Sequence, residues 1–183
     1  MNKPTTHSVY PNMVTALLVA LNLLAFALEL AWGVETSCET WGFTPAHFTV
    51  VGLLSGPYLH AGWGHLAGNM ALLGVFGTVV ERKLGPVHFA NLYCLSGIGA
   101  GLTHWMVDPS ATDTLVGASG SIFGILAASA MLFPHLVGFV CTYAAIEIGC
   151  LFLNAGSQIS AACHVGGFAT GFVIMLPLRE AFT

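Results

Sequence analysis

Six apolar stretches, separated by short polar breaks, constrain this chain more than any other feature of its sequence. A helix needs about 20 mostly apolar residues to cross a bilayer. The stretches that meet or approach this length are 13–32, 64–80, 87–107, 119–133, 136–153 and 161–178. Only 7% of the residues are charged, against about 25% in soluble domains. We therefore predict an all-α integral membrane protein with six spanning helices.

The chain is expected to form one membrane domain over residues 1–183, with a short cytoplasmic tail at residues 1–12. We expect no seventh span and no added soluble domain. The formal net charge of -4 is small and dispersed. No cluster of lysines and arginines is present that would neutralise phosphates. A nucleic-acid partner is therefore excluded, and the lipid bilayer is the expected surrounding.

The basic residues set the expected orientation of the spans. With six spans, the N-terminus, the second loop and the C-terminus lie on one side of the membrane. All lysines and arginines fall there, at Lys3, Arg82, Lys83 and Arg179. Because basic residues are enriched on the cytoplasmic side, we predict that both termini are cytoplasmic.

Ser119 lies in the sequence Gly117-Ala118-Ser119-Gly120, after a polar loop and at the start of the fourth stretch. A serine at this position can serve simply as a helix cap. The position also suits a nucleophile, because the free N–H groups at a helix N-terminus can stabilise an oxyanion. The small neighbours leave room for a substrate backbone. This motif alone does not decide between the two roles.

His164 begins a second motif, near the start of the sixth stretch. Gly167 and Gly171 follow at i+3 and i+7, so the three residues share one helical face. Glycines at this spacing let another helix pack closely, and the fourth stretch offers a matching pair that begins with Gly120. If these faces meet, Ser119 and His164 come together as a nucleophile and its base. A histidine hydrogen-bonded within the bundle is the alternative.

A third polar cluster, from His60 to Asn69, opens the second stretch. His65 and Asn69 stand at i and i+4 and share one face, where both can donate hydrogen bonds to a developing oxyanion. Polar contacts between helices are the alternative. His60, His65 and His164 could also converge on a metal ion. The sequence contains no HExxH motif and no Cys/His ligand set, so we expect no metal.

Together these motifs resemble those of the rhomboid family of intramembrane serine proteases. That family carries a GxSG serine at the start of its fourth transmembrane helix, a histidine followed by small residues on the sixth, and an HxxxN motif on the second. Their order and spacing agree here over residues 55–178. His60, five residues before His65, and the charged stretch Glu81-Arg82-Lys83-Leu84-Gly85 also match the family.

The resemblance implies a six-helix rhomboid bundle and a serine endopeptidase with a Ser119–His164 dyad. It implies that the Ser119 N–H, His65 and Asn69 stabilise the oxyanion, and that Phe123 packs against the catalytic histidine. Substrates would be single-span membrane proteins cut near the outer face of a bacterial inner membrane, with no cofactor. The supporting residues would be Gly117, Gly120, Phe123, Gly167, Gly171 and His60.

The first loop departs from the family pattern. Rhomboids usually carry a Trp-Arg motif shortly before the second helix, whereas the corresponding stretch here reads Thr49-Val50-Val51-Gly52 and the loop contains no arginine. The loop is rich in aromatic residues, which indicates a part-inserted, interfacial segment. These residues are Trp41, Phe43, Phe48 and Trp63. By family analogy, the fifth stretch is expected to gate substrate entry.

Three other classes of function fit parts of the sequence. The nearest is a non-catalytic membrane scaffold on the same fold, although such proteins lack the serine or the histidine that is present here. The eight histidines also allow a haem- or metal-binding protein. Finally, Glu29 and Glu147, the acids within the predicted spans, could form the proton relay of a transporter. Structural hydrogen bonds explain the two carboxyl groups better.

Overall fold

The computed structural model describes residues 12–152 and 158–182, in which every regular element is helical. The helices of the bundle are α1 (Met13–Trp32), α4 (Trp63–Leu72), α5 (Thr78–Leu84), α6 (Pro86–Val107), α7 (Ser119–Leu132), α8 (Val137–Phe152) and α9 (Gln158–Phe182). The shorter elements are α2 (Val34–Trp41), η1 (Pro45–His47), α3 (Val50–Ser55), η2 (Gly56–Tyr58), η3 (Leu73–Gly77) and η4 (Pro134–Leu136). The predicted all-α bundle is confirmed.

The six predicted spans correspond to α1, to the continuous helix α4–η3–α5, and to α6, α7, α8 and α9. Among the described residues, three helical segments are long and apolar enough to cross a membrane: α1, residues 63–84 and residues 161–182. α7 and residues 134–146 form shorter apolar helices. The bounds agree closely with the sequence because Gly, Pro or polar turns close most of the apolar runs.

The second span is longer than the sequence predicts. Its expected end is Val80, but the helix continues to Leu84, and Glu81 is fully buried instead of lying in a charged turn. The Glu81 carboxyl group accepts hydrogen bonds from the backbone N–H groups of Val14 (2.9 Å) and Thr15 (2.8 Å), and from the Thr15 hydroxyl (2.7 Å). These bonds satisfy donors in the first turn of α1 that have no partner within the helix.

A single π-helical turn, η3, interrupts this second span. Such a turn contains one more residue than an α-helical turn and is often found at functional sites. The span ends at Gly85, whose φ of 79° lies in the left-handed region that favours glycine. Pro86 then starts α6, because its fixed φ suits the first position of a helix.

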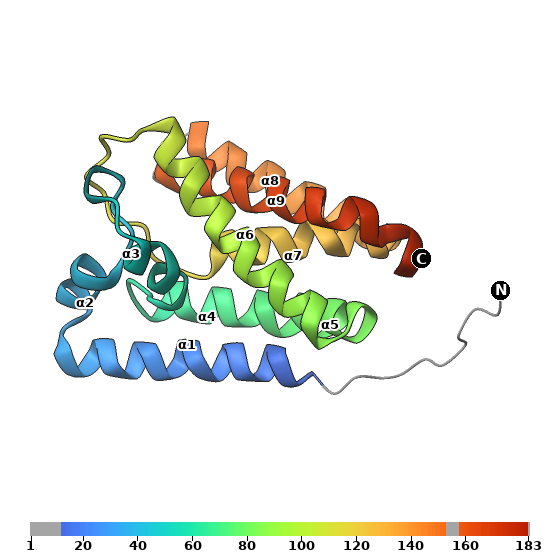
Figure 1. Cartoon of the computed structure of the whole chain (residues 1–183), viewed down its shortest axis with the longest axis horizontal. Coiled ribbons are helices and arrows are strands. Elements are labelled where there is room, and N and C mark those ends of the chain that lie inside the picture. The colour runs from blue at the N-terminus through green and yellow to red at the C-terminus, as the bar shows by residue number, and fades with distance from the viewer. Residues whose placement is uncertain (1–11, 153–157, 183) are drawn as a thin grey trace.

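α1 begins and α9 ends at the same end of the bundle, which we call the terminal end (Figure 1). α2, α3 and the loop of residues 108–118 lie at the opposite end, which we call the loop end (Figure 1). The three basic residues that the structure describes are at the terminal end. Arg82 and Lys83 lie in the last turn of α5, and Arg179 lies in the last turn of α9.

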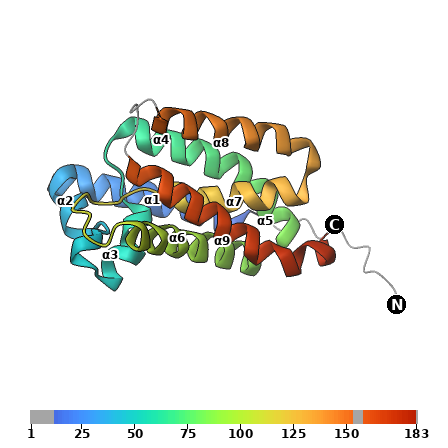
Figure 2. The same cartoon turned by 90° about the horizontal axis from the view of Figure 1, so that it is seen from above.

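α7 runs through the middle of the bundle, between α6, α9 and the second span (Figures 1 and 2). Nearly all of its residues are buried. α9 packs along α7 through glycines, as the sequence predicts: Gly167 lies against the backbone of Gly120, and Gly171 lies against the backbone of Gly124. A Cβ at Gly167 or Gly171 would overlap that backbone, so these positions hold the two helices at their close distance.

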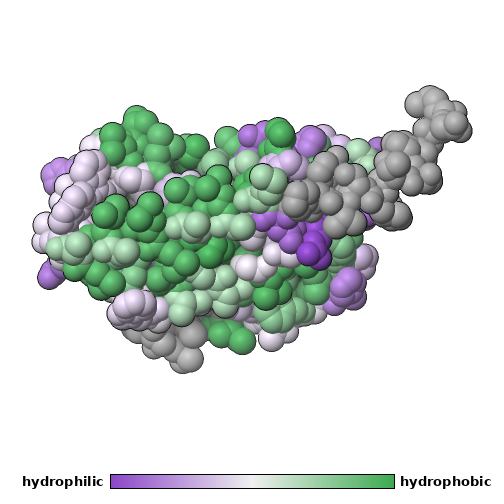
Figure 3. All heavy atoms as spheres, turned by 90° about the horizontal axis from the view of Figure 1, so that it is seen from below, coloured by the Kyte–Doolittle hydropathy of each residue, from purple (hydrophilic) through white to green (hydrophobic). Residues whose placement is uncertain are grey.

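Large apolar side chains cover the outside of the bundle. α1 exposes a row of leucines, which includes Leu17, Leu21, Leu24 and Leu28. Figure 3, which views the molecule from the side of α1, shows a mostly hydrophobic face with hydrophilic residues toward its ends. Soluble monomers rarely expose apolar patches of more than a few hundred Å². This surface fits a lipid surrounding and confirms the predicted membrane class.

The first loop, which its aromatic residues predict to be a part-inserted interfacial segment, forms short helices, and its insertion in the membrane stays a prediction. Residues 34–58 form helices α2 and α3 with the 3-10 turns η1 and η2. Trp41, Phe48 and Trp63 are exposed, as expected, but Phe43 is 1% exposed and belongs to the core. Phe43 points toward Gly101 of α6, and its ring also packs edge to face against the exposed Phe48.

Two expectations concern residues outside the described ranges. The tail predicted at residues 1–12 lies there except for Asn12, as do residues 154–157 in the turn before the sixth span. The side chain of Glu147 is likewise not among those described. The single-domain organisation predicted over residues 1–183 stays a prediction.

Candidate active site

Ser119 is the first residue of α7 and lies at the loop end. Gly117, two positions earlier, has a φ of 111°, in the left-handed region that favours glycine. A Cβ at Gly117 would lie 2.5 Å from the ring of His65, so the position has no room for a side chain either. Gly117 therefore shapes the turn that presents Ser119 at a helix N-terminus, where the helix dipole favours negative charge.

His164 lies on α9, one turn before Gly167, and is 8% exposed. Its ring stacks on Phe123 of α7, with 4.1 Å between the centroids and 12° between the planes. Phe123 stands one turn after Ser119. Because Gly120 packs directly on Gly167, the first turn of α7 meets the turn of α9 that carries His164. The structure thus brings Ser119 and His164 to the same contact between two helices.

His65 and Asn69 project from α4 toward the turn that leads into Ser119. The ring of His65 and the amide nitrogen of Asn69 lie 2.5 and 3.3 Å from the position that a Cβ of Gly117 would take. His65 is also close enough to His164 to interact with it electrostatically. Three helices and one loop therefore gather these residues at a single place in the bundle.

His60 lies in the loop before α4 and is fully buried. Its Nε2 atom lies 3.0 Å from the amide nitrogen of Asn69, and its ring packs edge to face against His65, with 5.1 Å between centroids. An amide nitrogen can only donate, so His60 Nε2 accepts. Burial, helped by the neighbouring His65, lowers the pKa of His60 to about 4. The ring is therefore neutral at pH 7 and able to accept.

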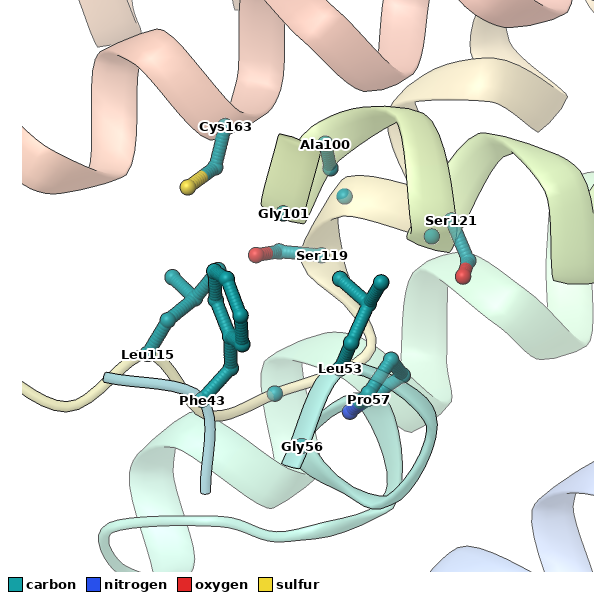
Figure 4. Close-up of a pocket in the computed structure, with 13 residues that line it drawn as sticks. Phe43, Leu53, Gly56, Pro57, Ala100, Gly101, Leu115, Ser119, Ser121 and Cys163 are labelled. Atoms are coloured by element: carbon teal, nitrogen blue, oxygen red, sulfur yellow. The ribbon is translucent and has the colours of Figure 1, made fainter. Parts of the chain in front are cut away.

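A small cavity of about 20 Å³ lies beside Ser119. Figure 4 shows the Ser119 hydroxyl and the Cys163 thiol directed toward it. Its walls include Phe43 and Leu53 from the first loop and small residues of α6 such as Ala100. Because the space is narrow, the cavity can hold only a small group next to the hydroxyl.

The first loop is anchored to the loop of residues 108–118. Phe43 and Leu115 exchange two backbone hydrogen bonds, of 3.0 and 2.8 Å, and the N–H of Gly117 donates to the carbonyl of Gly56 at 2.9 Å. These bonds hold the first loop in the absence of the Trp-Arg motif noted above. They also fix the segment that leads into Ser119.

Comparison with known proteins agrees with this arrangement. The family model of the Rhomboid domain matches residues 47–181, which include all of the motifs described above. The chain belongs to the rhomboid family. The predicted resemblance and the rhomboid fold are therefore confirmed, whereas the catalytic roles of Ser119, His164, His65 and Asn69 stay predictions.

Several curated rhomboid proteins are similar in sequence. The chain is 33% identical over 187 residues to Rhomboid protease GluP of Bacillus subtilis, covering 92% of this chain and 36% of GluP. It is 27% identical over 193 residues to Rhomboid protein 1, mitochondrial, of Saccharomyces cerevisiae (91% and 54%). It is 32% identical over 141 residues to RHOMBOID-like protein 5 of Arabidopsis thaliana (71% and 45%). The chain spans about half the length of these relatives or less.

Some residues that line the site do not belong to any of the sequence motifs described above. Phe43, Leu53 and Leu115 line the cavity beside the predicted nucleophile, but they come from loops far apart in sequence, so no local pattern predicts them. One available signal is the i,i+4 pair of small residues on α6, Gly97 and Gly101. A Cβ at Gly101 would overlap the Leu53 side chain, and a Cβ at Gly97 would overlap the Ser121 hydroxyl. Gly101 therefore makes room for the first loop, and Gly97 makes room for α7.

A metal centre is the other chemistry that the histidines allowed. Within residues 12–152 and 158–182, no group of three or more His, Cys, Asp or Glu side chains is placed to hold a metal ion. His60 uses Nε2 to accept from Asn69, which leaves that atom unavailable as a ligand.

Proposed function

We propose that this rhomboid is an intramembrane serine endopeptidase, with Ser119 as nucleophile and His164 as general base. One observation carries the proposal: the close contact of α7 with α9 joins the turn of Ser119 to the turn of His164, with His65 and Asn69 beside it. The relative GluP is named a rhomboid protease, which supports the same activity.

In this mechanism the Ser119 oxygen attacks the carbonyl carbon of the scissile peptide bond while His164 takes the hydroxyl proton. The negative charge on the carbonyl oxygen is stabilised by the Ser119 N–H, His65 and Asn69. When the tetrahedral intermediate collapses, the C–N bond breaks and His164 gives its proton to the leaving amine. Water then attacks the acyl-enzyme, again with His164 as base, and releases the new carboxylic acid and free Ser119.

Phe123 has a supporting role in this mechanism. In serine hydrolases with a triad, a buried carboxylate holds the imidazole in the productive orientation. Here the stacked ring of Phe123 restricts the His164 ring without adding a charge. A further buried charge would be costly inside a membrane.

The expected substrates are single-span membrane proteins. The cavity beside Ser119 supports a small side chain next to the scissile bond, since larger groups would meet Phe43 or Leu53. The substrate helix must unwind to present its backbone, which helix-destabilising residues make easier. α8, at the edge of the bundle in Figure 2, is the proposed gate. It contacts the second span through the stacked rings of Phe139 and Phe76, 5.2 Å apart.

The proposed orientation follows from charge. The described basic residues lie at the terminal end, and basic residues are enriched on the cytoplasmic side of membrane proteins. The site lies at the opposite, loop end. We therefore propose cleavage near the non-cytoplasmic face of a bacterial inner membrane.

The test is cleavage of a fluorescent single-span reporter by the full chain in lipid vesicles. We expect Ser119→Ala and His164→Ala each to lose about 100-fold or more in rate. Ser129→Ala is the matched control, because the Ser129 hydroxyl lies further along α7 and only donates to the carbonyl of Ile125, at 2.9 Å. This variant should cleave like the parent.

Labelling with a serine-reactive fluorophosphonate gives a second readout. The parent and Ser129→Ala should be labelled, and Ser119→Ala should not. Cleavage by Ser119→Ala at the parent's rate would sink the protease proposal. A parent that neither cleaves nor labels would point to the non-catalytic scaffold.

A further inference from the structure

Glu29, near the end of α1, is buried, with 2% of its surface exposed. Its carboxyl group accepts the backbone N–H of His60, with Oε2 at 3.0 Å and Oε1 at 3.3 Å. In the part of the chain that the structure describes, this N–H is the hydrogen-bond donor to Glu29. A buried carboxyl group is costly unless it is hydrogen-bonded, so the bond between α1 and the loop before α4 is strongly favoured.

A second contact fixes the same segment of chain. Phe26, one turn before Glu29 on α1, packs edge to face against Trp63, with 5.0 Å between centroids and 78° between planes. Trp63 is the first residue of α4. α1 therefore holds the segment of residues 60–63 at both of its ends.

The held segment supports both proposed donors of the oxyanion site. His60 Nε2 accepts one N–H of the Asn69 amide, which leaves the second N–H free to point elsewhere. The amide nitrogen lies on the side of Gly117, next to the turn that carries Ser119. The ring of His60 also packs against His65, so a shift of His60 would disturb both donors.

We infer that Glu29 is a positioning residue of the oxyanion site. By accepting the N–H of His60 it sets the His60 ring, and that ring orients the Asn69 amide and packs against His65. Glu29 itself does not reach the reacting atoms. The inference rests on the proposed function for its catalytic consequence, but the structural coupling from Glu29 to Asn69 stands on the hydrogen bonds alone.

The first test separates kcat from KM in vesicle cleavage assays. Glu29→Ala should lower kcat about tenfold and leave KM unchanged, because an oxyanion donor acts in the transition state and misplacement weakens it. Glu29→Gln should keep most of the activity, since its amide oxygen can still accept the N–H of His60. Glu29→Asp, whose shorter side chain does not reach that N–H, should resemble Glu29→Ala and guards against a misfolded alanine variant.

A double-mutant cycle tests the route through Asn69. If Glu29 acts in part through this amide, then Glu29→Ala should lower kcat clearly less in an Asn69→Ala background than in the parent, and the remaining loss would reflect the contact of His60 with His65. Glu81→Gln is the matched control. This variant alters the second buried carboxyl group that contacts α1. Among the described residues the hydrogen bonds of Glu81 go to Val14 and Thr15 and not toward Asn69. It should keep the kcat of the folded enzyme.

A measurement without substrate completes the test. In ¹⁵N-histidine-labelled protein, His60 should show a neutral ring with Nε2 accepting a hydrogen bond, and Glu29→Ala should shift that signal. Three outcomes would each overturn the inference. Glu29→Ala could have the same kcat as the parent, its effect on kcat could be fully additive with that of Asn69→Ala, or the His60 signal could stay unchanged in Glu29→Ala. If the parent does not cleave, the proposed function fails, and the ¹⁵N signal still decides whether Glu29 sets the His60 ring.

Discussion

α1 is joined to the rest of the bundle by a buried carboxyl group near each of its ends, and the two differ in how fully they are hydrogen-bonded. At the terminal end, Glu81 of α5 accepts three bonds from Val14 and Thr15. At the loop end, Glu29 of α1 accepts only the N–H of His60 among the described residues. Both carboxyl groups are buried, at 0% and 2% exposed.

The difference separates a structural contact from one that serves the site. Glu81 satisfies the donors of a helix start, where carboxyl groups are stabilising, and it lies at the end of the molecule away from Ser119. Glu29 stabilises the fold less, because it satisfies one donor, but that donor belongs to a residue that contacts both His65 and Asn69. We therefore expect loss of Glu81 to affect stability and loss of Glu29 to affect catalysis.

The largest expected effect on stability belongs to Glu81→Ala. It leaves the two buried donors of Thr15 and the part-buried N–H of Val14 without their acceptor. Each unsatisfied buried donor costs about 1–3 kcal/mol, so the free energy of unfolding should fall by roughly 3 kcal/mol. The kcat of the remaining folded protein should stay at the parent's value. Denaturant unfolding in mixed micelles, with cleavage measured per folded molecule, checks both parts.

Two further variants serve as comparisons for the stability of Glu81→Ala. Glu180→Ala removes an exposed glutamate at the same end of the molecule and should change stability by less than about 0.5 kcal/mol. Glu29→Ala leaves one donor unsatisfied and should cost about 1–2 kcal/mol. The proposed difference between the two carboxyl groups would be contradicted if Glu29→Ala and Glu81→Ala lost equal stability. It would also be contradicted if Glu81→Ala lowered kcat.

A smaller effect is expected for Thr15→Val. This change removes the hydroxyl that donates to Glu81 at 2.7 Å but keeps the shape of the side chain and the backbone N–H. The free energy of unfolding should fall by about 1 kcal/mol, with no change in kcat. Thr15→Ser retains the hydroxyl and should stay closer to the parent, so a larger loss in Thr15→Ser would assign the effect to packing instead.

A further effect concerns acid. The pKa of His60 is about 4 in the folded protein and near 6.5 in the unfolded chain. Because the folded value is the lower one, the contribution of His60 to stability is complete above pH 6.5 and is lost as the pH falls toward 4. We expect the unfolding free energy of the parent to fall more over this range than that of His60→Gln, which does not titrate there. Parallel pH curves would contradict this.

Features that repeat along one helix could be predicted from the sequence, both in the fold and in the candidate site. The apolar runs located six helices, and the spacing of Gly167 and Gly171 predicted the face that meets Gly120. The predicted contact of Phe123 with His164 is also present. These features repeat along a single helix, so a local pattern is enough to find them.

The features that the sequence did not predict depend on residues far apart in the chain. The bond from His60 to Glu29 joins positions 31 apart, and the Thr15–Glu81 contact joins positions 66 apart. Glu81 in particular fell in the charged stretch that follows the expected end of the second span at residue 80, and buried acids are rare unless paired. Only its three donors, contributed by another helix, make its burial favourable.

The π-helical turn η3 has a consequence for the angular register of the second span. An α-helix rotates by about 100° per residue, so Asn69 and Glu81, twelve positions apart, would face directions about 120° apart on an uninterrupted helix. A π-turn contains one extra residue without extra rotation, so it reduces the angle between the two side chains by about 100°. Asn69 and Glu81 then point about 20° apart, on nearly the same face of the span, where Asn69 contacts His60 and Glu81 contacts the start of α1. The number of residues between these two side chains is therefore fixed, and a one-residue insertion or deletion there would turn one of them away from its partner.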